Sequence, residues 1–356
     1  MSTPVLRAVD PGPLATIQDG GRRLWQRYGV SPAGPADPPS HAIANLLVGN
    51  PRAAAAVEFT LIGGTWQVEA TSVRLAVAGG SFPISVDGQA APGRRSLTLR
   101  RGQSLTIGPA DDAVRGYLAV AGGFALPAVL DSLATHVRSG LGGLDGRAIG
   151  RGAALPLGLD AAPESPDLAL DARELPPRRL PLRIVLGPQD DQFFPAAIAN
   201  LLDTDYTVTR EADRMGCKLA GAPLPHRGGH NIISDGIATG SIQVPGSGQP
   251  ILLLVDRQTT GGYPKIATVI SADLGTAGQL RPGDRVRFAR VTVAEAQGLA
   301  RQARTGLDGL AARLSPVGPW DSNHLDAGRL LGLNLIGGVV SAGTAGENVD
   351  ACQLET

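Results

Sequence analysis

The chain has 356 residues, with 32 basic and 32 acidic side chains and a formal net charge of zero at pH 7. This length allows two domains with buried cores that need no disulfide or metal for support. The balanced charge, without a long basic run or basic residues interleaved with aromatics, argues against a nucleic-acid partner.

Three features of the sequence indicate the cellular location. The start, MSTPVLRAVDPGP, lacks the basic and apolar regions of a signal peptide. Cys217 and Cys352 match no ligand-pair spacing, so a reducing compartment is expected. The most apolar late stretch, LLGLNLIGGVVSAGTAG, is shorter than a hydrocarbon core requires. We therefore expect a cytoplasmic protein without a membrane span.

Short strands are the main predicted elements. Glycine and proline make up more than a fifth of the chain, which predicts many turns. Runs with β-branched residues and Gly or Pro boundaries predict strands, among them TWQVEA, VRLAVAGGSF, RGYLAVAGGF, LRIVLG, GSIQVP, PILLLVD and DRVRFARV. The predicted helices are few: SHAIANLLVG, capped by Ser40 and ending at Gly49, then FFPAAIANLLD, then Val293 to Leu314. The expected fold class is mainly β with a few helices.

Repeated fragments predict two related β-barrel-like domains. LAVAGG begins at Leu75 and Leu118, AIANLL begins at Ala42 and Ala197, and RRGQSLTI resembles the later RPGDRVRF. The stretch APESPDLALDARELPPRRLP is rich in Pro and charge, as a linker is. The expected organisation is a β-rich domain at 1–162, a linker at 163–182, a second β domain at 183–292 and a helical extension at 293–356.

The first polar cluster is TIQDGGRRLWQRYGVSPAGPADP, from Thr16 to Pro38. Its glycines and prolines predict a loop, and loops on a rigid scaffold often carry binding groups. Its candidate substrate-binding residues are Gln18, Asp19, Arg22, Arg27 and Tyr28. The alternative is a solvated connection in which Asp19 and Asp37 cap turns and helices, and the residues alone do not decide between the two.

A second candidate site surrounds VDRQTTGGYPKIATV, between two apolar strands. Lys265 and Lys218 are the only lysines, so an ammonium at position 265 is not a generic surface charge. Amide side chains pair with amide edges, Arg clamps a carboxylate, and Lys stabilises a developing oxyanion or phosphate. The candidates are Lys265, Asp256 and Arg257 for catalysis, and Gln243, Gln258, Thr259, Tyr263, Ser234 and Arg214 for binding. By itself, Arg214 in READRMGCKLAG is typical of a solvated strand edge.

Common catalytic signatures are missing from the sequence. GGYPK does not fit the Walker A spacing, and GLGGLDG does not fit the dinucleotide fingerprint. His226 and His230 lie in a glycine loop and not on a helix with a Glu base, so no metal site is expected.

Several motifs together resemble one family. They are TIQDGGRRLWQRYGV, ANLLVGNP followed by EFTLIGGT, RGYLAVAGGF, DRMG and GSIQVPGSGQPILLLVDRQTTGGYPKIATVISADL. They are similar to allophanate hydrolase subunit 2, now usually described as the C subunit of 5-oxoprolinase, a family that includes KipA and half of the urea carboxylase carboxyltransferase domain. The resemblance covers about Pro11 to Arg290, and DRQTTGGYPKIA is highly specific to the family.

The resemblance implies two cyclophilin-like β-barrel domains and work inside an assembly. The implied partners are the B subunit of 5-oxoprolinase, which is KipI-like, together with its A subunit, which is of the LamB/YcsF type, and a small amide as substrate. Together they would open the lactam of 5-oxoproline to glutamate with ATP and Mg bound by this chain or by a partner. The alternatives are a carboxyltransferase acting on urea or another small amide, and a KipA-type regulator that binds a KipI-like kinase inhibitor.

The resemblance also suggests roles for the candidates. Lys265 would stabilise negative charge, Arg257 would hold the substrate carboxylate, and Asp256 would orient one of them. Where the family usually has V-P-x-S-G-A-M-D, this chain has VSPAGPAD, so Ala33, Pro35 and Ala36 replace Ser, Ala and Met, and Asp37 is kept. Neither Met1 nor Met215 directly precedes a lysine, so we expect no biotin attached to this chain.

Overall fold

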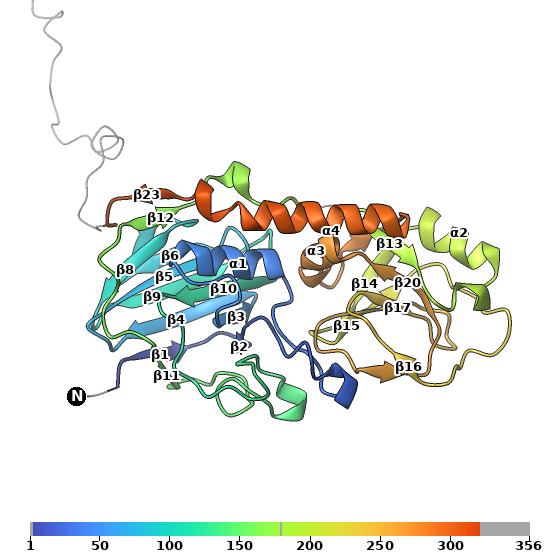
Figure 1. Ribbon diagram of the computed structural model, residues 1–356, viewed down its shortest axis with the longest axis horizontal. Coiled ribbons are helices and arrows are strands. Elements are labelled where there is room, and N and C mark those ends of the chain that lie inside the picture. The colour runs from blue at the N-terminus through green and yellow to red at the C-terminus, as the bar shows by residue number, and fades with distance from the viewer. Residues whose placement is uncertain (1–2, 179, 321–356) are drawn as a thin grey trace, which may run out of the picture. The chain divides into compact units, whose positions relative to one another are not determined.

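Two antiparallel sheets form the N-terminal half of the chain in the computed structural model, which describes residues 3–178 and 180–320 (Figure 1). The six-stranded sheet has the order β11 (Ala154–Pro156), β1 (Val5–Asp10), β4 (Ile62–Val68), β9 (Ser104–Pro109), β6 (Ile84–Val86), β7 (Gln89–Ala91). The five-stranded sheet has the order β2 (Ala15–Gln18), β3 (Ala56–Thr60), β10 (Arg115–Val120), β5 (Ser72–Ala78), β8 (Ser96–Arg100). The central strand β10, RGYLAV, is buried at every residue, as a strand covered on both faces must be.

Helix α1 (Pro38–Leu47) covers one face of the five-stranded sheet and packs on β10 and β5. Its Ile43 and Leu47 are buried against alanines of those two strands. The helix begins two residues before Ser40, the predicted cap, because the Asp37 side chain accepts the Ser40 N–H and prolines occupy the first turn. Asp37 is therefore fixed at the start of α1.

A nearly closed barrel forms the C-terminal half. Its eight strands have the order β21 (Arg285–Val286), β14 (Tyr206–Ala212), β15 (Gly216–Ala220), β18 (Ile251–Leu253), β17 (Ser241–Gln243), β20 (Lys265–Val269), β13 (Leu182–Leu186), β22 (Phe288–Arg290). The edge strands β21 and β22 are separated only by Arg287, so the chain passes directly from one edge to the other. A small ribbon of β16 (Asp235–Gly236) and β19 (Thr260–Gly261) lies beside the barrel.

Three further α-helices lie on or beside the barrel: α2 (Pro195–Asp203), α3 (Leu274–Gly278) and α4 (Val293–Asp308). Figure 1 shows α4 running past both halves. It packs on the 3-10 turn η5 (Ser271–Asp273) and on β13, and its Asp308 pairs with Arg52 of the N-terminal half at 2.5 Å. The last strand, β23 (Ser315–Val317), then pairs with β12 (Asp167–Ala169). This final part of the described chain thus ties the two halves together.

The predicted fold class, mainly β with few helices in two barrel-like halves, is confirmed. The third predicted helix ends at Asp308, before Leu314, because Gly309 follows it. Helix α3 was not predicted, because LGTAG is little more than one turn long and contains two glycines. The domain boundaries remain a prediction, and residues 321–356 of the expected helical extension lie outside the described residues.

Candidate functional site

A cleft of about 740 Å³ opens where the loop 20–36 and the start of α1 face residues 254–257 of the barrel. Its lining contains no acidic residue but has four arginines, Arg23, Arg52, Arg257 and Arg304. Asp308 is the acidic partner of two of them, since it lies 2.5 Å from Arg52 and 3.9 Å from Arg304, and its one charge offsets one of the two cations. Arg23 and Arg257 remain without an acidic partner among the described residues. The cleft is therefore suited to a ligand that carries a carboxylate or a phosphate.

Arg257 is the most buried cation of this cleft, with 2% of its surface exposed. Its Nε donates to the Ile237 carbonyl at 3.1 Å and its Nη2 to Gln26 Oε1 at 3.0 Å. Gln26 also donates to the same carbonyl, at 2.8 Å, so the guanidinium is held from two sides. Burial lowers the pKa of Arg257 to about 10, which leaves it cationic at neutral pH. Its Nη1 is buried without a hydrogen-bond partner and could donate to an anionic ligand.

Several buried side-chain atoms lack a protein hydrogen bond in the loop 20–36, in the segment 132–146 bonded to it, and at Arg257. Besides Arg257 Nη1, the buried side-chain atoms without a hydrogen bond in the described part of the chain are Arg22 Nη1, Trp25 Nε1, Thr135 Oγ1 and His136 Nδ1. The other ring nitrogen of His136 lies 3.4 Å from the carbonyl oxygen of Asp256, beside Arg257 in sequence. Folded proteins satisfy most of their buried polar atoms. Of these five residues, only Arg257 lines the cleft.

A buried ionic network joins the two halves next to the cleft. Arg214 donates to Asp256 through Nε at 2.8 Å and Nη2 at 3.0 Å, and its Nη1 donates to Glu58 of β3. Its Nη2 also donates to the Gly34 carbonyl at 2.7 Å. Burial by itself would lower the pKa of Arg214, but the charges of Asp256 and Glu58 outweigh burial and raise it. Arg214 is therefore a cationic link between the barrel and the cleft loop.

Glu58 is the acid at the other end of this network, with 2% of its surface exposed. It accepts hydrogen bonds from the Ala36 N–H at 2.9 Å and from the Tyr117 hydroxyl at 2.7 Å. Burial would raise the pKa of Glu58, but the charges of Arg214 and Arg115 outweigh it and lower the pKa. Glu58 thus remains a carboxylate that holds residues 34–36 in the cleft wall.

Two of the predicted binding residues in the first cluster fix the loop in place. Gln18 is fully buried, accepts the Gly34 N–H at 3.0 Å and donates to the Thr135 carbonyl at 3.0 Å. Asp19 accepts from Ser132 Oγ and from the Leu133 N–H, both at 2.6 Å. These bonds join the loop 16–36 to the segment 132–146, so both side chains are occupied by the protein itself.

The other three predicted residues of the first cluster lie in different environments: Arg22 is buried, whereas Arg27 and Tyr28 are exposed. Arg22 is 1% exposed, and its Nε donates to the Val129 carbonyl at 3.0 Å. Burial lowers the pKa of Arg22. Arg27 and Tyr28 are exposed and stack on one another, with 4.9 Å between the guanidinium carbon and the ring centre. Neither Arg27 nor Tyr28 lines the cleft.

Lys265 lies in a second polar group on the barrel and is 3% exposed. Its Nζ is 2.9 Å from Asp235 Oδ2, and its backbone N–H donates to Gln189 Oε1 at 3.1 Å. The hydrogen bond from Lys265 lowers the pKa of Asp235. Gln243 lies opposite Lys265 in the sheet and accepts from Gln258 Nε2 at 3.4 Å. The structure thus brings Lys265, Gln243 and Gln258 together on neighbouring segments of the barrel.

The remaining predicted residues lie around this second group. Tyr263 is 41% exposed, and its carbonyl accepts from Gln243 Nε2 at 3.2 Å. Thr259 accepts the Ile237 N–H through its carbonyl, and Ser234 is exposed beside β16. Asp256, which was expected to orient Arg257 or Lys265, contacts Arg214 instead, and Asp235 is the acid at Lys265. The family roles of these residues remain predictions.

Some residues that shape the site had little signal in the sequence. Glu58 lies in an apolar strand, and Gln189 follows a strand in a polar turn, so neither stood out. His136 had no helical partner at metal-ligand spacing. Asp235 and Gln26 stood inside the polar clusters, but nothing local showed which basic group each would meet. Ala33, Pro35 and Ala36, where this chain departs from the family motif, line the cleft and make that wall apolar.

Neither a metal centre nor a membrane helix occurs in the described part of the chain. Within residues 3–178 and 180–320, no group of three or more His, Cys, Asp or Glu side chains is placed to hold a metal ion. Among the same residues, no helix has the length and apolar character needed to cross a bilayer.

The chain is similar to proteins of known name. Residues 28–290 match the model of the carboxyltransferase domain, subdomain A and B. The chain is 34% identical to the C subunit of 5-oxoprolinase from Escherichia coli over 314 residues, which cover 87% of this chain and 99% of that protein. It is 29% identical to urea amidolyase of Saccharomyces cerevisiae, matching 85% of this chain but only 18% of that protein.

A solved structure gives the same result. The crystal structure of urea carboxylase from Kluyveromyces lactis superposes with a TM-score of 0.80 and 26% identity, covering 87% of this chain and 29% of that one. The barrel, the cleft loop and the DRQTTGGYPK run all lie within or beside the matched residues 28–290. The chain therefore belongs to the family of the carboxyltransferase domain with subdomains A and B, and it is a homologue of the 5-oxoprolinase C subunit.

Proposed function

We propose that this chain is the C subunit of an ATP-dependent 5-oxoprolinase, which opens the lactam of 5-oxoproline to glutamate. The similarity to the Escherichia coli protein is the main support, since it is 34% identity over 87% of this chain and 99% of that protein. That protein is named as one subunit of an enzyme, which implies partners. For this chain we propose a KipI-like B subunit together with a LamB/YcsF-like A subunit.

The cleft supports this substrate class. 5-Oxoproline carries one carboxylate beside one lactam amide, so it needs a cation and amide-pairing groups a short distance apart. Arg257 offers its unpartnered Nη1, and Gln26 beside it holds the guanidinium in place. We assign the carboxylate to Arg257, because a buried guanidinium is a strong and specific partner for that group.

Lys265 is assigned to the charge that develops at the lactam carbonyl or at phosphate. Opening a lactam removes amide resonance, and the overall reaction consumes ATP and two waters to give glutamate, ADP and phosphate. An ammonium that is 3% exposed and paired with Asp235 is held ready to stabilise such charge. The other arginines of the cleft could bind a phosphate through their N–H groups, so we place ATP either here or on a partner subunit.

Reconstitution tests the proposed function. This chain is co-expressed with the A and B subunits, and ATP hydrolysis is measured with and without 5-oxoproline, then again with this chain omitted. We expect 5-oxoproline-dependent hydrolysis and glutamate formation only when all three are present. Turnover that continues without this chain, or a stable complex that never turns over 5-oxoproline, contradicts the proposal. A tight complex without turnover is the result expected of a KipA-type regulator.

Carboxyl transfer to urea is a second candidate, favoured by the similarity to urea amidolyase and urea carboxylase. This chain matches less than a third of each of those proteins, so it would act with a separate biotin carboxylase and a separate biotin carrier. Urea-dependent loss of carboxyl groups from a carboxybiotin carrier, measured with this chain alone, distinguishes this candidate from the first.

A further inference from the structure

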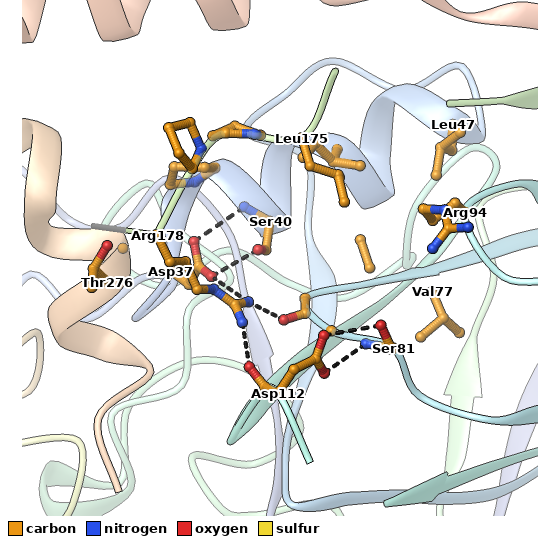
Figure 2. A pocket seen from close by; sticks show the side chains of 18 of the residues that line it. Asp37, Ser40, Leu47, Val77, Ser81, Arg94, Asp112, Leu175, Arg178 and Thr276 are labelled. Carbon is orange, nitrogen blue, oxygen red and sulfur yellow. Dashed lines mark hydrogen bonds and ion pairs between the residues drawn. The ribbon is translucent and has the colours of Figure 1, made fainter. Parts of the chain in front are cut away.

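A second pocket lies on the other side of helix α1 and is enclosed on several sides (Figure 2). Its volume is about 230 Å³. Ile43 and Leu47 of α1 line it together with Val77 of β5, and the segment 175–178 closes it from the side of the linker. Residues 38, 41 and 42 of the same helix line the cleft instead, so α1 separates the two cavities.

The walls of this pocket combine apolar and polar side chains, and the apolar ones include Ile43, Leu47 and Val77. Figure 2 shows Asp37 and Arg178 together at one end, and Arg94 near Leu47 at the other. Apolar walls with a few polar groups are typical of sites for small molecules. A volume of about 230 Å³ is well above what one water needs, so the pocket has room for a ligand of several non-hydrogen atoms.

The charged groups at the first end are already satisfied by the protein. Asp37 accepts from Ser40 Oγ at 2.7 Å and from Gln279 Nε2 at 2.8 Å. Arg178 donates to the carbonyls of Gly79 and Asp112 and lies 3.5 Å from Asp37. The Asp112 carboxylate, the other acid of the lining, accepts from the backbone and hydroxyl of Ser81 at 2.8 and 2.9 Å. These groups have little capacity left for a charged ligand.

Arg94 differs from them. Its guanidinium makes no hydrogen bond or ion pair with any of the described residues. Asp171 is close enough to sense its charge, but both oxygens of Asp171 accept from Arg173, at 3.1 and 2.7 Å. Arg94 is exposed, and it is the one charged side chain of the described lining that makes no hydrogen bond with the protein, so its charge is available to an anion.

We propose that this pocket binds a small monocarboxylate with a short unbranched apolar tail. The tail would lie between Ile43, Leu47 and Val77, and the carboxylate would bind the Arg94 guanidinium. This pocket is a different cavity from the cleft, because the two lie on opposite sides of α1 and share no lining residue. The inference does not depend on the proposed enzymatic activity, because binding is measured directly.

Hexanoate is the probe, since it has the required size and charge. Binding to the full chain is measured by isothermal titration calorimetry, with hexan-1-ol and hexylamine as uncharged and cationic comparisons. Arg94→Gln removes the guanidinium, and Arg100→Gln is the matched control, since Arg100 is exposed on β8 and does not line the pocket. Arg257→Gln reports any binding in the cleft.

We expect hexanoate to bind with one site per chain, and Arg94→Gln to weaken it about tenfold, the usual effect of a charge-assisted hydrogen bond. Arg100→Gln and Arg257→Gln should leave the affinity within about twofold, and hexan-1-ol should bind more weakly than hexanoate. The proposal is overturned if hexanoate shows no saturable binding, if Arg94→Gln binds it as well as the unmodified chain, or if hexylamine binds equally well. Loss of binding in Arg257→Gln overturns it too, because the ligand would then occupy the cleft.

Discussion

Arg214 and Asp256 form a two-pronged ion pair, with Nε 2.8 Å from Oδ2 and Nη2 3.0 Å from Oδ1. Both side chains are buried, and the third nitrogen of Arg214 reaches Glu58 in the other half of the chain. A buried ion pair adds little compared with apolar packing, but removing one partner leaves an uncompensated charge. The network therefore fixes how the two walls of the cleft meet, and it can be tested one residue at a time.

Replacing Glu58 with Gln is expected to lower the free energy of unfolding by about 3 kcal/mol, because Arg214 and Arg115 lose a buried counter-charge. Urea unfolding at pH 7 measures the change. Glu69→Gln is the control, since Glu69 forms a partly exposed pair with Arg7 and its loss should cost at most about 1 kcal/mol. Equal effects of the two substitutions would show that the network contributes nothing special.

The Glu58 carboxylate also predicts a pH dependence. Its pKa is lower in the folded protein than the ordinary value of 4.5, so the folded state binds this proton less readily than the unfolded state. The stabilisation is present above pH 4.5 and is lost as the pH falls through the lower folded value. The free energy of unfolding is measured from about pH 7 to about pH 3 for the unmodified chain and for Glu58→Gln. The difference between the two free energies should become smaller as the pH falls. A constant difference across that range contradicts this assignment.

Lys265→Arg should reduce 5-oxoproline-dependent ATP hydrolysis in the reconstituted complex at least about tenfold. The ammonium sits in a buried position against Asp235, and the broader guanidinium cannot take the same place. Lys218→Arg is the matched control, because Lys218 is the other lysine and forms an exposed pair with Glu211. Unchanged melting temperatures would separate lost chemistry from lost folding. Full activity of Lys265→Arg would remove this residue from the reaction.

Arg257→Gln should raise the KM for 5-oxoproline at least about tenfold, because the substrate carboxylate loses its charged partner. Steady-state kinetics of the reconstituted complex measure it. Arg227→Gln, an exposed arginine of the barrel, removes the same charge away from the cleft and should leave KM unchanged. If only kcat falls and KM stays constant, Arg257 does not hold the carboxylate in the ground state.

Two glycines in the segment beside the cleft loop allow a paired test of packing. An added Cβ at Gly142 would lie 2.1 Å from Arg22 Nη2 and 2.2 Å from the Ala134 oxygen, whereas at Gly140 it would meet nothing within 4 Å. Both have positive φ, +68° and +63°, so the backbone cost of alanine is similar, about 1–2 kcal/mol. Gly142→Ala should therefore cost about 1–3 kcal/mol more than Gly140→Ala in urea unfolding. An equal loss of unfolding free energy in the two variants would show that the segment around Gly142 shifts to make room for the added methyl group.

Local sequence patterns were enough to predict the β-rich class, the places of the three longer helices and the polar run 255–269. These follow from local patterns: β-branched runs bounded by glycine, a capping residue before an apolar face, and a lysine in a chain that otherwise uses arginine almost throughout. They depend on residues within a few positions of one another, so they can be read without knowledge of the fold.

Which charged side chains meet depends on contacts between distant parts of the chain. Arg214 bonds Glu58 from 156 positions away, and Arg257 bonds Gln26 from 231 positions away. No local pattern encodes such pairs, because they depend on how the barrel packs against the N-terminal sheets. For the same reason, Gln18 and Asp19 form hydrogen bonds with other segments of the protein. Asp256 pairs with Arg214, and Asp235 pairs with Lys265. The residue types that the chemistry needs were visible in the sequence, whereas their partners were set by the fold.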